Sequence, residues 1–294
     1  MKPTSTSLCL LVLAFAGVSA FAQTPAAPAW HQPKYSDIYC AGFIADKPLE
    51  SGLFVVTGED RGLKQIYSDR DTIFLSRGAG NIVNPGGEYM LLRAATDPIR
   101  EEFFKGQKQM LQSLGTLYKE VGRIKVHIVH EKTATANVVN SCMEIQAGDI
   151  AIPFNQKPIP KFQAAGFDRF APPSGKNEGL IVTGKEFLNT LGTGDKVYLN
   201  IGSSMGVEVG QSYRVYRTFL PAVKDPAMRA GNESIAEYVG SERLNYKLTD
   251  LQKRALPRDV IGELVILWVE GKTATGYITM ATTEIYSGDQ VELK

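Results

Sequence analysis

The sequence predicts an all-β protein built from two tandem small β-modules, each carrying an inserted helical or loop segment. Long stretches of the chain recur at fixed offsets, which indicates one module written twice. Within each stretch, polar and apolar residues alternate with the two-residue period of a β-strand. Glycines end these runs where tight turns need a positive φ: Gly86, Gly148, Gly210 and Gly288.

The internal similarity falls into two blocks. DTIFLSRGAGNIVNPGGEYMLLR at 71–93 recurs as DKVYLNIGSSMGVEVGQSYRVYR at 195–217, an offset of 124 positions. VGRIKVHIVHEKTATANVVNSCMEIQAGDI at 121–150 recurs as IGELVILWVEGKTATGYITMATTEIYSGDQ at 261–290, an offset of 140. The offset rises by 140 − 124 = 16, so the second copy carries the longer insertion. Five or six short strands per copy are enough for a closed barrel or a two-layer sandwich.

The N-terminus has the pattern of a cleaved export signal. A basic residue precedes an apolar run at 8–18, and Ala-Phe-Ala at 20–22 has the small-x-small form that signal peptidase reads. We expect the signal to be residues 1–22, cut between Ala22 and Gln23. The run is too short to span a bilayer, and no later stretch is long enough. The predicted protein is therefore exported, without an integral membrane segment.

Composition divides the remaining chain into four parts. Residues 23–37 are rich in proline and alanine and predict a flexible leader. The two β-modules are expected over 38–154 and 179–294, joined by a proline- and glycine-rich linker at 155–178. The first insertion predicts a helix that starts at Asp97 and Pro98, and the second predicts a short helix near LTDLQKRAL.

The charge balance gives no electrostatic footprint for nucleic acid or anionic lipid. Removing Lys2 with the signal leaves 32 − 1 = 31 basic residues against 31 acidic residues. Two cysteines remain, Cys40 and Cys142. In an oxidising compartment such a pair is expected to form one disulfide. The alternative is a nucleophilic or metal-binding thiol.

One strand of the second copy is apolar on both faces. In ELVILWV, alternation places Leu264, Ile266 and Trp268 toward the core, as it places Ile124, Val126 and Ile128 in the first copy. The other face is listed last: Val265, Leu267 and Val269. A strand apolar on both faces must be covered on both. The cover is either the first module or the long insertion, or else another subunit or an envelope partner.

Three residue groups invite a chemical interpretation, and none supports one. His127 and His130 lie three apart on a strand, hence on opposite faces, and His31 is the only other histidine. The Gly-x-Gly of SRGAGN is followed by a strand, whereas a phosphate loop needs a helix there. Recurring carboxylates suit structural turns: Glu144, Asp149, Glu284 and Asp289. We therefore predict no catalytic residue, cofactor or metal, and no enzyme.

The second copy reads D-x-V-x-L-x-x-G-x-x-x-G-V-x-x-G-x-x-Y-x-V-Y-R, then I-G-x-L-x-I and T-A-T-G…E-I-x-x-G-D. This pattern resembles the C-terminal domain of the flagellar assembly protein T family, and related β-modules at the ends of exported LysM-bearing proteins. The first copy departs from it, with Ile82 in place of the second glycine and Leu91-Leu92 in place of Val-Tyr. The resemblance implies SH3-like barrels in the periplasm of a Gram-negative envelope. It supplies no catalytic residues.

These observations give three hypotheses about function. The first is a non-catalytic envelope protein, a structural or protein-interaction module whose partner is an envelope protein or a cell-wall component. The second is a peptidoglycan- or polysaccharide-binding adaptor that uses exposed aromatic side chains such as Tyr198, Tyr216 and Tyr277. The third is an enzyme that works in a groove between the two modules.

Overall fold

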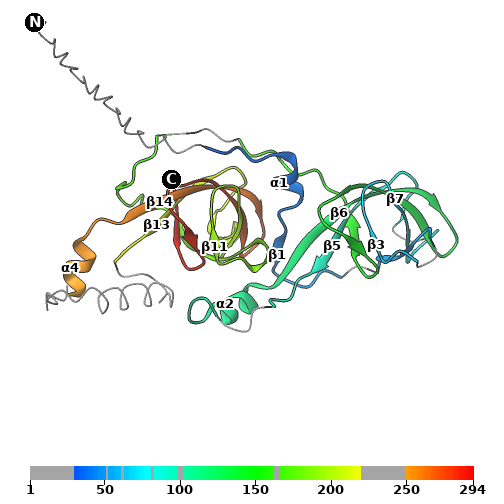
Figure 1. Ribbon diagram of the computed structural model, residues 1–294, viewed down its shortest axis with the longest axis horizontal. Coiled ribbons are helices and arrows are strands. Elements are labelled where there is room, and N and C mark those ends of the chain that lie inside the picture. The colour runs from blue at the N-terminus through cyan, green and yellow to red at the C-terminus, as the bar shows by residue number, and fades with distance from the viewer. Residues whose placement is uncertain are drawn as a thin grey trace, which may run out of the picture.

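The computed structural model describes residues 30–50, 52–60, 63–80, 83–98, 102–161, 164, 166–219 and 249–294. The described chain forms two β-barrels that lie one after the other along the long axis (Figure 1). The predicted all-β fold of small barrel modules is confirmed. The expected export signal and its cleavage site, Ala22 and Gln23, lie outside the described residues.

The first barrel contains six antiparallel strands in the order β2-β4-β7-β6-β5-β9. Their bounds in that order are β2 Val55–Gly58, β4 Thr72–Leu75, β7 Ala134–Ser141, β6 Thr116–Val129, β5 Glu88–Ala94 and β9 Ile150–Pro153. A bridge between Phe54 and Ile150 brings the two end strands together. Two shorter strands, β3 Ile66–Tyr67 and β8 Ile145–Gln146, pair beside the barrel.

The second barrel is closed and has the same order, β10-β12-β15-β14-β13-β17. Its strands are β10 Glu178–Gly184, β12 Lys196–Leu199, β15 Ala274–Ala281, β14 Asp259–Val269, β13 Ser212–Arg217 and β17 Gln290–Leu293. The short pair is β11 Thr190–Leu191 with β16 Ile285–Tyr286, and two 3-10 turns are η1 Lys185–Phe187 and η2 Ser203–Met205.

The recurring Glu-Ile-x-x-Gly-Asp segment forms the same ion pair in both barrels. Asp149 accepts two hydrogen bonds from the Arg93 guanidinium, at 2.6 and 2.8 Å. Asp289 accepts two from Arg217, both at 2.7 Å. Each aspartate also accepts the backbone N–H three residues before it, at 2.8 and 2.7 Å. The aspartates are therefore structural, and each ties the last strand to its neighbour β5 or β13.

A β-bulge at the same place in both barrels breaks the predicted alternation. The register shifts between Val126 and Ile128, and again between Ile266 and Trp268. An extra residue in one strand inverts the faces of all residues after it. Ile128 is therefore 54% exposed instead of buried, and Trp268 lies outside the core. Val269, expected on the outer face, packs against the barrel core.

The structure contains three short helices among the described residues: α1 Tyr35–Tyr39, α2 Gln107–Leu114 and α4 Asp250–Ala255. The helix near LTDLQKRAL is confirmed as α4, whose N-cap is Thr249. The first insertion begins its helix later than Asp97. The Glu102 carboxylate accepts the backbone N–H groups of Gly106 and Lys108, at 2.9 and 3.0 Å, and so fixes the start of α2.

Residues 38–46, which we call the junction segment, lie between the two barrels. Within this segment, β1 (Phe43–Ala45) pairs with β6 of the first barrel. Its opposite side faces the second barrel. The carbonyl of Ile44 accepts the Thr273 hydroxyl at 2.7 Å, and that of Gly42 accepts the Thr275 hydroxyl at 3.0 Å. One extended segment is thus hydrogen-bonded on both sides.

The described part of the predicted flexible leader is ordered. Tyr35–Tyr39 form α1, and the backbone N–H of His31 donates to the carbonyl of Thr279 in the second barrel at 2.8 Å. Lys196 of the second barrel pairs with Asp37 at 2.5 Å. Composition predicted a flexible leader, but these contacts hold residues 31–37 against β15 and β12.

The apolar outer face of β14 is covered within the chain. Val265 and Leu267 are fully buried in one cluster with Tyr39 and Phe43 of the N-terminal region. Of the two alternatives for this face, packing against the first module is the one observed. Val265 and Leu267 are therefore not accessible to an external partner.

A disulfide and a buried ion pair fasten the junction segment to the first barrel. Cys40 and Cys142 are bonded, as predicted, across a sequence separation of 102 residues. Lys157, from the predicted linker, pairs with Glu120 and donates to the carbonyl of Ile38 at 3.0 Å. Both charged side chains are almost completely buried. A buried pair of this kind makes the loss of either partner costly.

We expect Leu267→Ala to destabilise the whole protein by about 2–5 kcal/mol, because it leaves a cavity between the barrels. Ile128→Ala, at an exposed position near the end of β6 in the first barrel, is expected to change stability by less than about 0.5 kcal/mol. Denaturant unfolding followed by circular dichroism measures both. Equal effects of the two substitutions would contradict this assignment of the junction.

Candidate functional site

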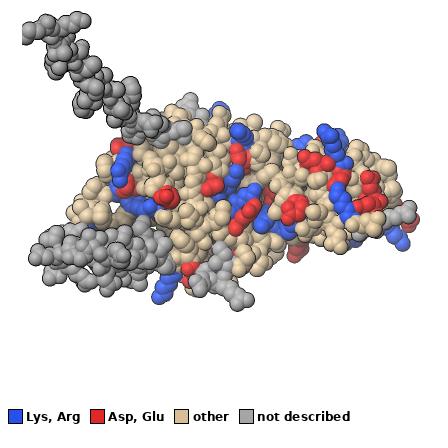
Figure 2. All heavy atoms as spheres, in the orientation of Figure 1, with Lys and Arg blue, Asp and Glu red and all other residues tan. Residues whose placement is uncertain are grey.

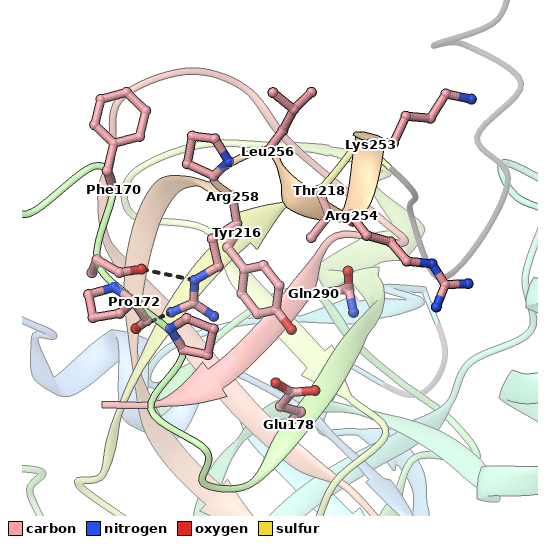
Figure 3. Close-up of a pocket in the computed structure, with 13 residues that line it drawn as sticks. Phe170, Pro172, Glu178, Tyr216, Thr218, Lys253, Arg254, Leu256, Arg258 and Gln290 are labelled. Atoms are coloured by element: carbon pink, nitrogen blue, oxygen red, sulfur yellow. Dashed lines mark hydrogen bonds between the residues drawn. The ribbon is translucent and has the colours of Figure 1, made fainter. Parts of the chain in front are cut away.

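A pocket of about 640 Å³ opens on the second barrel, on the side of β13 and β17. Figure 3 shows how three parts of the chain surround it: the stretch 170–173, the end of α4, and the barrel strands. Phe170, Pro172, Pro173, Leu256 and Pro257 supply apolar surface. A concave site with apolar walls and a few polar groups is the usual form of a binding site.

The floor of the pocket is fixed by a buried arginine. Arg258 forms two hydrogen bonds with the Glu292 carboxylate, and Glu292 is fully buried. The same guanidinium donates to the carbonyls of Ala171 at 3.0 Å and Pro172 at 2.8 Å. It lies 4.6 Å from the centre of the Tyr216 ring. These bonds occupy the polar groups of Arg258 and Glu292, so neither is available to a ligand, and they hold the stretch 170–173 on the barrel.

Burial and the charge of Arg258 together set the protonation of Tyr216 and Glu292. Removal from water raises the pKa of Tyr216 to about 12, and the negative charge of Glu178 acts in the same direction. Burial alone would raise the pKa of Glu292, but the hydrogen bond and charge of Arg258 outweigh it and hold that pKa below its usual value. At neutral pH the floor therefore contains a neutral phenol and a carboxylate already paired, so neither is free to transfer a proton.

The rim supplies two cations and an amide, and one of the cations, Lys253, also lies 3.7 Å from the Asp250 carboxylate. Lys253 and Arg254, from α4, stand on one side of the opening, and Gln290 lies between the barrel strands (Figure 3). Within the described residues, the side chains of Arg254 and Gln290 have no hydrogen-bond partner. Two cations beside apolar walls suit a segment or ligand that carries an apolar group next to an acidic one.

The pocket exists because this face differs between the barrels. The backbone N–H of Val260 donates to the carbonyl of Arg169 at 2.8 Å, so the stretch after Arg169 runs along β14 as β1 runs along β6. On that register Ala171 takes the place of Phe43. A methyl group in place of a phenyl ring leaves space. At the neighbouring positions, Leu92 and Ile150 of the first barrel are replaced by Tyr216 and Gln290.

The histidines singled out in the sequence do not form a metal centre with other ligands. His127 and His130 are both exposed, and the His130 imidazole bonds the Thr135 hydroxyl at 2.8 Å. His31 lies at the second barrel. Among the described residues, no group of three or more histidine, cysteine or carboxylate side chains could hold a metal ion.

The aromatic side chains proposed for a polysaccharide adaptor are buried. Tyr198, Tyr216 and Tyr277 are 1%, 4% and 4% exposed. Tyr198 donates to the carbonyl of Ala41 at 2.8 Å, within the junction. Tyr198 does lie outside the core of its own barrel, but this outer face is covered by the N-terminal region. These tyrosines therefore stabilise the protein and are not available to stack on a sugar.

The pocket itself was not found by sequence reasoning. Lys253, Arg254 and Arg258 occur in a segment interpreted only as a short helix in a polar insertion. One signal was present: Arg258 and Glu292 are charged where the first copy has Tyr118 and Ile152. A charge at a position that is apolar in the other copy indicates a different local role.

The surface of the molecule has no dominant sign of charge in the view of Figure 2, where basic and acidic side chains alternate along both barrels. Within the described residues, none of the helices has the length and apolar character needed to cross a membrane. A scan against protein-family models and a search of curated proteins both found no match for this chain.

We expect Glu292→Gln to cost about 3–5 kcal/mol near pH 7, because it leaves the buried Arg258 charge without its partner. The folded pKa of Glu292 lies below its usual value, so its contribution is present above that value and is lost as the pH falls through the folded pKa. The difference in the free energy of unfolding between wild type and variant should therefore become smaller in acid. Urea unfolding at several pH values measures it.

Glu144→Gln, at an exposed position, is the control, and its free energy of unfolding should equal that of wild type at every pH. A difference for Glu292→Gln that stays constant into acid would contradict the role given to the ion pair.

Proposed function

We propose that this protein is a non-catalytic exported protein of the cell envelope that acts as a structural and protein-interaction module. The observation that carries the proposal is the pocket on the second barrel. Its buried titratable groups, Arg258 and Glu292, bind each other and the backbone, while its cationic rim is open. Such an arrangement favours binding over proton transfer.

The construction of the two barrels supports a scaffold role. The junction segment is hydrogen-bonded to both barrels, and a buried ion pair and a disulfide anchor it. A pocket on a rigid body presents its binding groups at low entropic cost. A segment of a partner protein with an apolar side chain beside an acidic one fits the pocket by chemistry.

The location in the periplasm of a Gram-negative envelope rests on the export signal pattern and on the resemblance to the flagellar assembly protein T modules. The disulfide supports an oxidising compartment. The SH3-like character of the barrels and the doubling of one module belong to the same proposal. The polysaccharide adaptor is not retained, because the tyrosines that suggested it are buried.

We expect the double variant Lys253→Glu/Arg254→Glu to lose at least about tenfold of the partner captured by the wild-type chain, because it inverts the rim charge. The measurement is affinity capture from the solubilised envelope of the native host, with quantitative mass spectrometry. Any envelope protein counts as partner, other copies of this chain included.

The matched control is Lys47→Glu/Lys105→Glu, which makes the same charge change at exposed lysines outside the pocket. It should capture as much as wild type. Equal capture by the rim variant and the wild type would refute the pocket as the binding site.

A further inference from the structure

The contact between the two barrels provides a template for a contact between two molecules. The hairpin that joins β14 to β15, residues 268–273, rests on the junction segment. The Trp268 ring lies 6.1 Å from the ring of Phe43, and Thr273 donates to the carbonyl of Ile44 at 2.7 Å. Trp268, at the base of the hairpin, and Thr273, from its Lys-Thr-Ala-Thr sequence, thus contact a segment that pairs with β6 of the first barrel.

The first barrel has the same hairpin, and among the described residues no segment of the second barrel or of the junction rests on it. Residues 128–133 join β6 to β7, and they end in the same Lys-Thr that grips the junction segment. Ile128, which corresponds to Trp268, is 54% exposed. Glu131 and Thr133 are exposed at the tip. Trp268 and Thr273, the two groups named for the internal contact, therefore have exposed counterparts on the first barrel, Ile128 and Thr133.

The second barrel has the counterpart of the junction segment. The stretch 169–173 runs along β14, held by the Arg169 to Val260 hydrogen bond, as β1 runs along β6. No hairpin of the described chain rests on it. Phe170 is 60% exposed, and the pocket opens beside it. The pocket borders α4, at the opposite end of the long axis from β7 (Figure 1).

We propose that the pocket of one molecule binds the 128–133 hairpin of a second copy of this chain, so that molecules associate head to tail. The inference rests on the proposed function, in which the pocket takes a protein segment, and names that segment. Ile128 meets the apolar wall formed by Ala171 and its neighbour Phe170, and Glu131 lies toward Arg254. The correspondence with the internal junction, in which the equivalent hairpin of the second barrel rests on the equivalent segment of the first, favours a second copy over an unrelated partner.

The contact uses two different surfaces, so each bound copy leaves one hairpin and one pocket free. Such a heterologous contact adds further copies instead of stopping at a dimer. The strand positions of Val265 and Leu267 carry Lys125 and His127 in the first barrel. The contact between molecules is therefore more polar than the internal one, and we expect it to be weaker and to weaken further with salt.

The test is sedimentation velocity on the chain from residue 23 onward, at protein concentrations up to about 1 mM, where weak association becomes visible. Wild type should sediment faster as its concentration rises, without stopping at a dimer. Ile128→Glu removes the hairpin contact and Phe170→Glu removes the pocket contact. Each variant alone should remain monomeric, since both substitutions are at exposed positions and should leave the fold intact.

A mixture of the two variants gives the sharpest result. The intact hairpin of Phe170→Glu fits the intact pocket of Ile128→Glu, so the mixture should form a one-to-one dimer and nothing larger. Leu63→Glu, at a side chain 93% exposed, is the matched control and should associate like wild type. Circular dichroism confirms that each variant is folded.

A wild-type chain that stays monomeric throughout, association that either variant retains, or a mixture that does not dimerise would each overturn the proposal. If any of these occurs while the rim charges still govern capture of another envelope protein, the self-association fails and the interaction function stands. If capture is also independent of the rim, both fail.

Discussion

The packing of the two barrels against each other depends on one segment of the chain that lies between them. Residues 38–46 give main-chain groups to the sheet of the first barrel and carbonyl acceptors to hydroxyls of the second. The backbone N–H and C=O groups of the segment give hydrogen-bond partners to polar groups on both barrels, which would otherwise have to be hydrogen-bonded by water. The apolar side chains of the segment fill the space between them, so that Val265 and Leu267 are completely buried. The two barrels are therefore one packed unit and not two domains on a tether.

The anchoring of that segment explains which buried charges the protein retains. Glu120 lies on β6 under the segment and also accepts the backbone N–H of Gly42 at 3.1 Å. Lys157, its partner, comes from the chain that leaves the first barrel, and its ammonium group lies 5.0 Å from the Trp268 ring centre. One ion pair thus touches the first barrel, the segment, the linker and the second barrel. Arg258 and Glu292 do the equivalent work for the stretch 169–173.

Much of the frame was predictable because strands and turns are local properties. Alternation, glycine punctuation and the recurrence at fixed offsets predicted small β-barrel modules, and two cysteines in a chain expected to be exported predicted the disulfide. The errors in predicting which residues are buried come from β-bulges and tertiary contacts, which the alternation of polar and apolar residues does not reveal. A bulge before Ile128 and another before Trp268 reversed the predicted faces. The proline- and alanine-rich composition of residues 23–37 predicted a flexible leader and gave no sign that part of it packs on the second barrel. Tyr198 was expected to be exposed, but only the tertiary contact with the junction segment shows that this side of the second barrel is buried.

The pocket was hidden for the same reason. It arises where Ala171 takes the place of Phe43 and where polar residues replace the apolar ones of the first barrel, and those differences have meaning only once the covering stretches are known. Sequence comparison of the two copies locates the differing positions. It does not tell which of them face one another, because the lining comes from the linker, an insertion and three strands.

The central claim, that the barrels and the segment form one unit, can be tested with the chain's two tryptophans. Trp268 packs against Phe43 of the segment, and Trp30 lies 5.6 Å from the Lys294 ammonium group on the second barrel. Both therefore report on contacts of the N-terminal region, while far-ultraviolet circular dichroism reports on the barrels. In a guanidinium titration the two signals should change with one common midpoint, as in a single cooperative transition. A tryptophan transition that is complete before the barrels unfold would contradict the account.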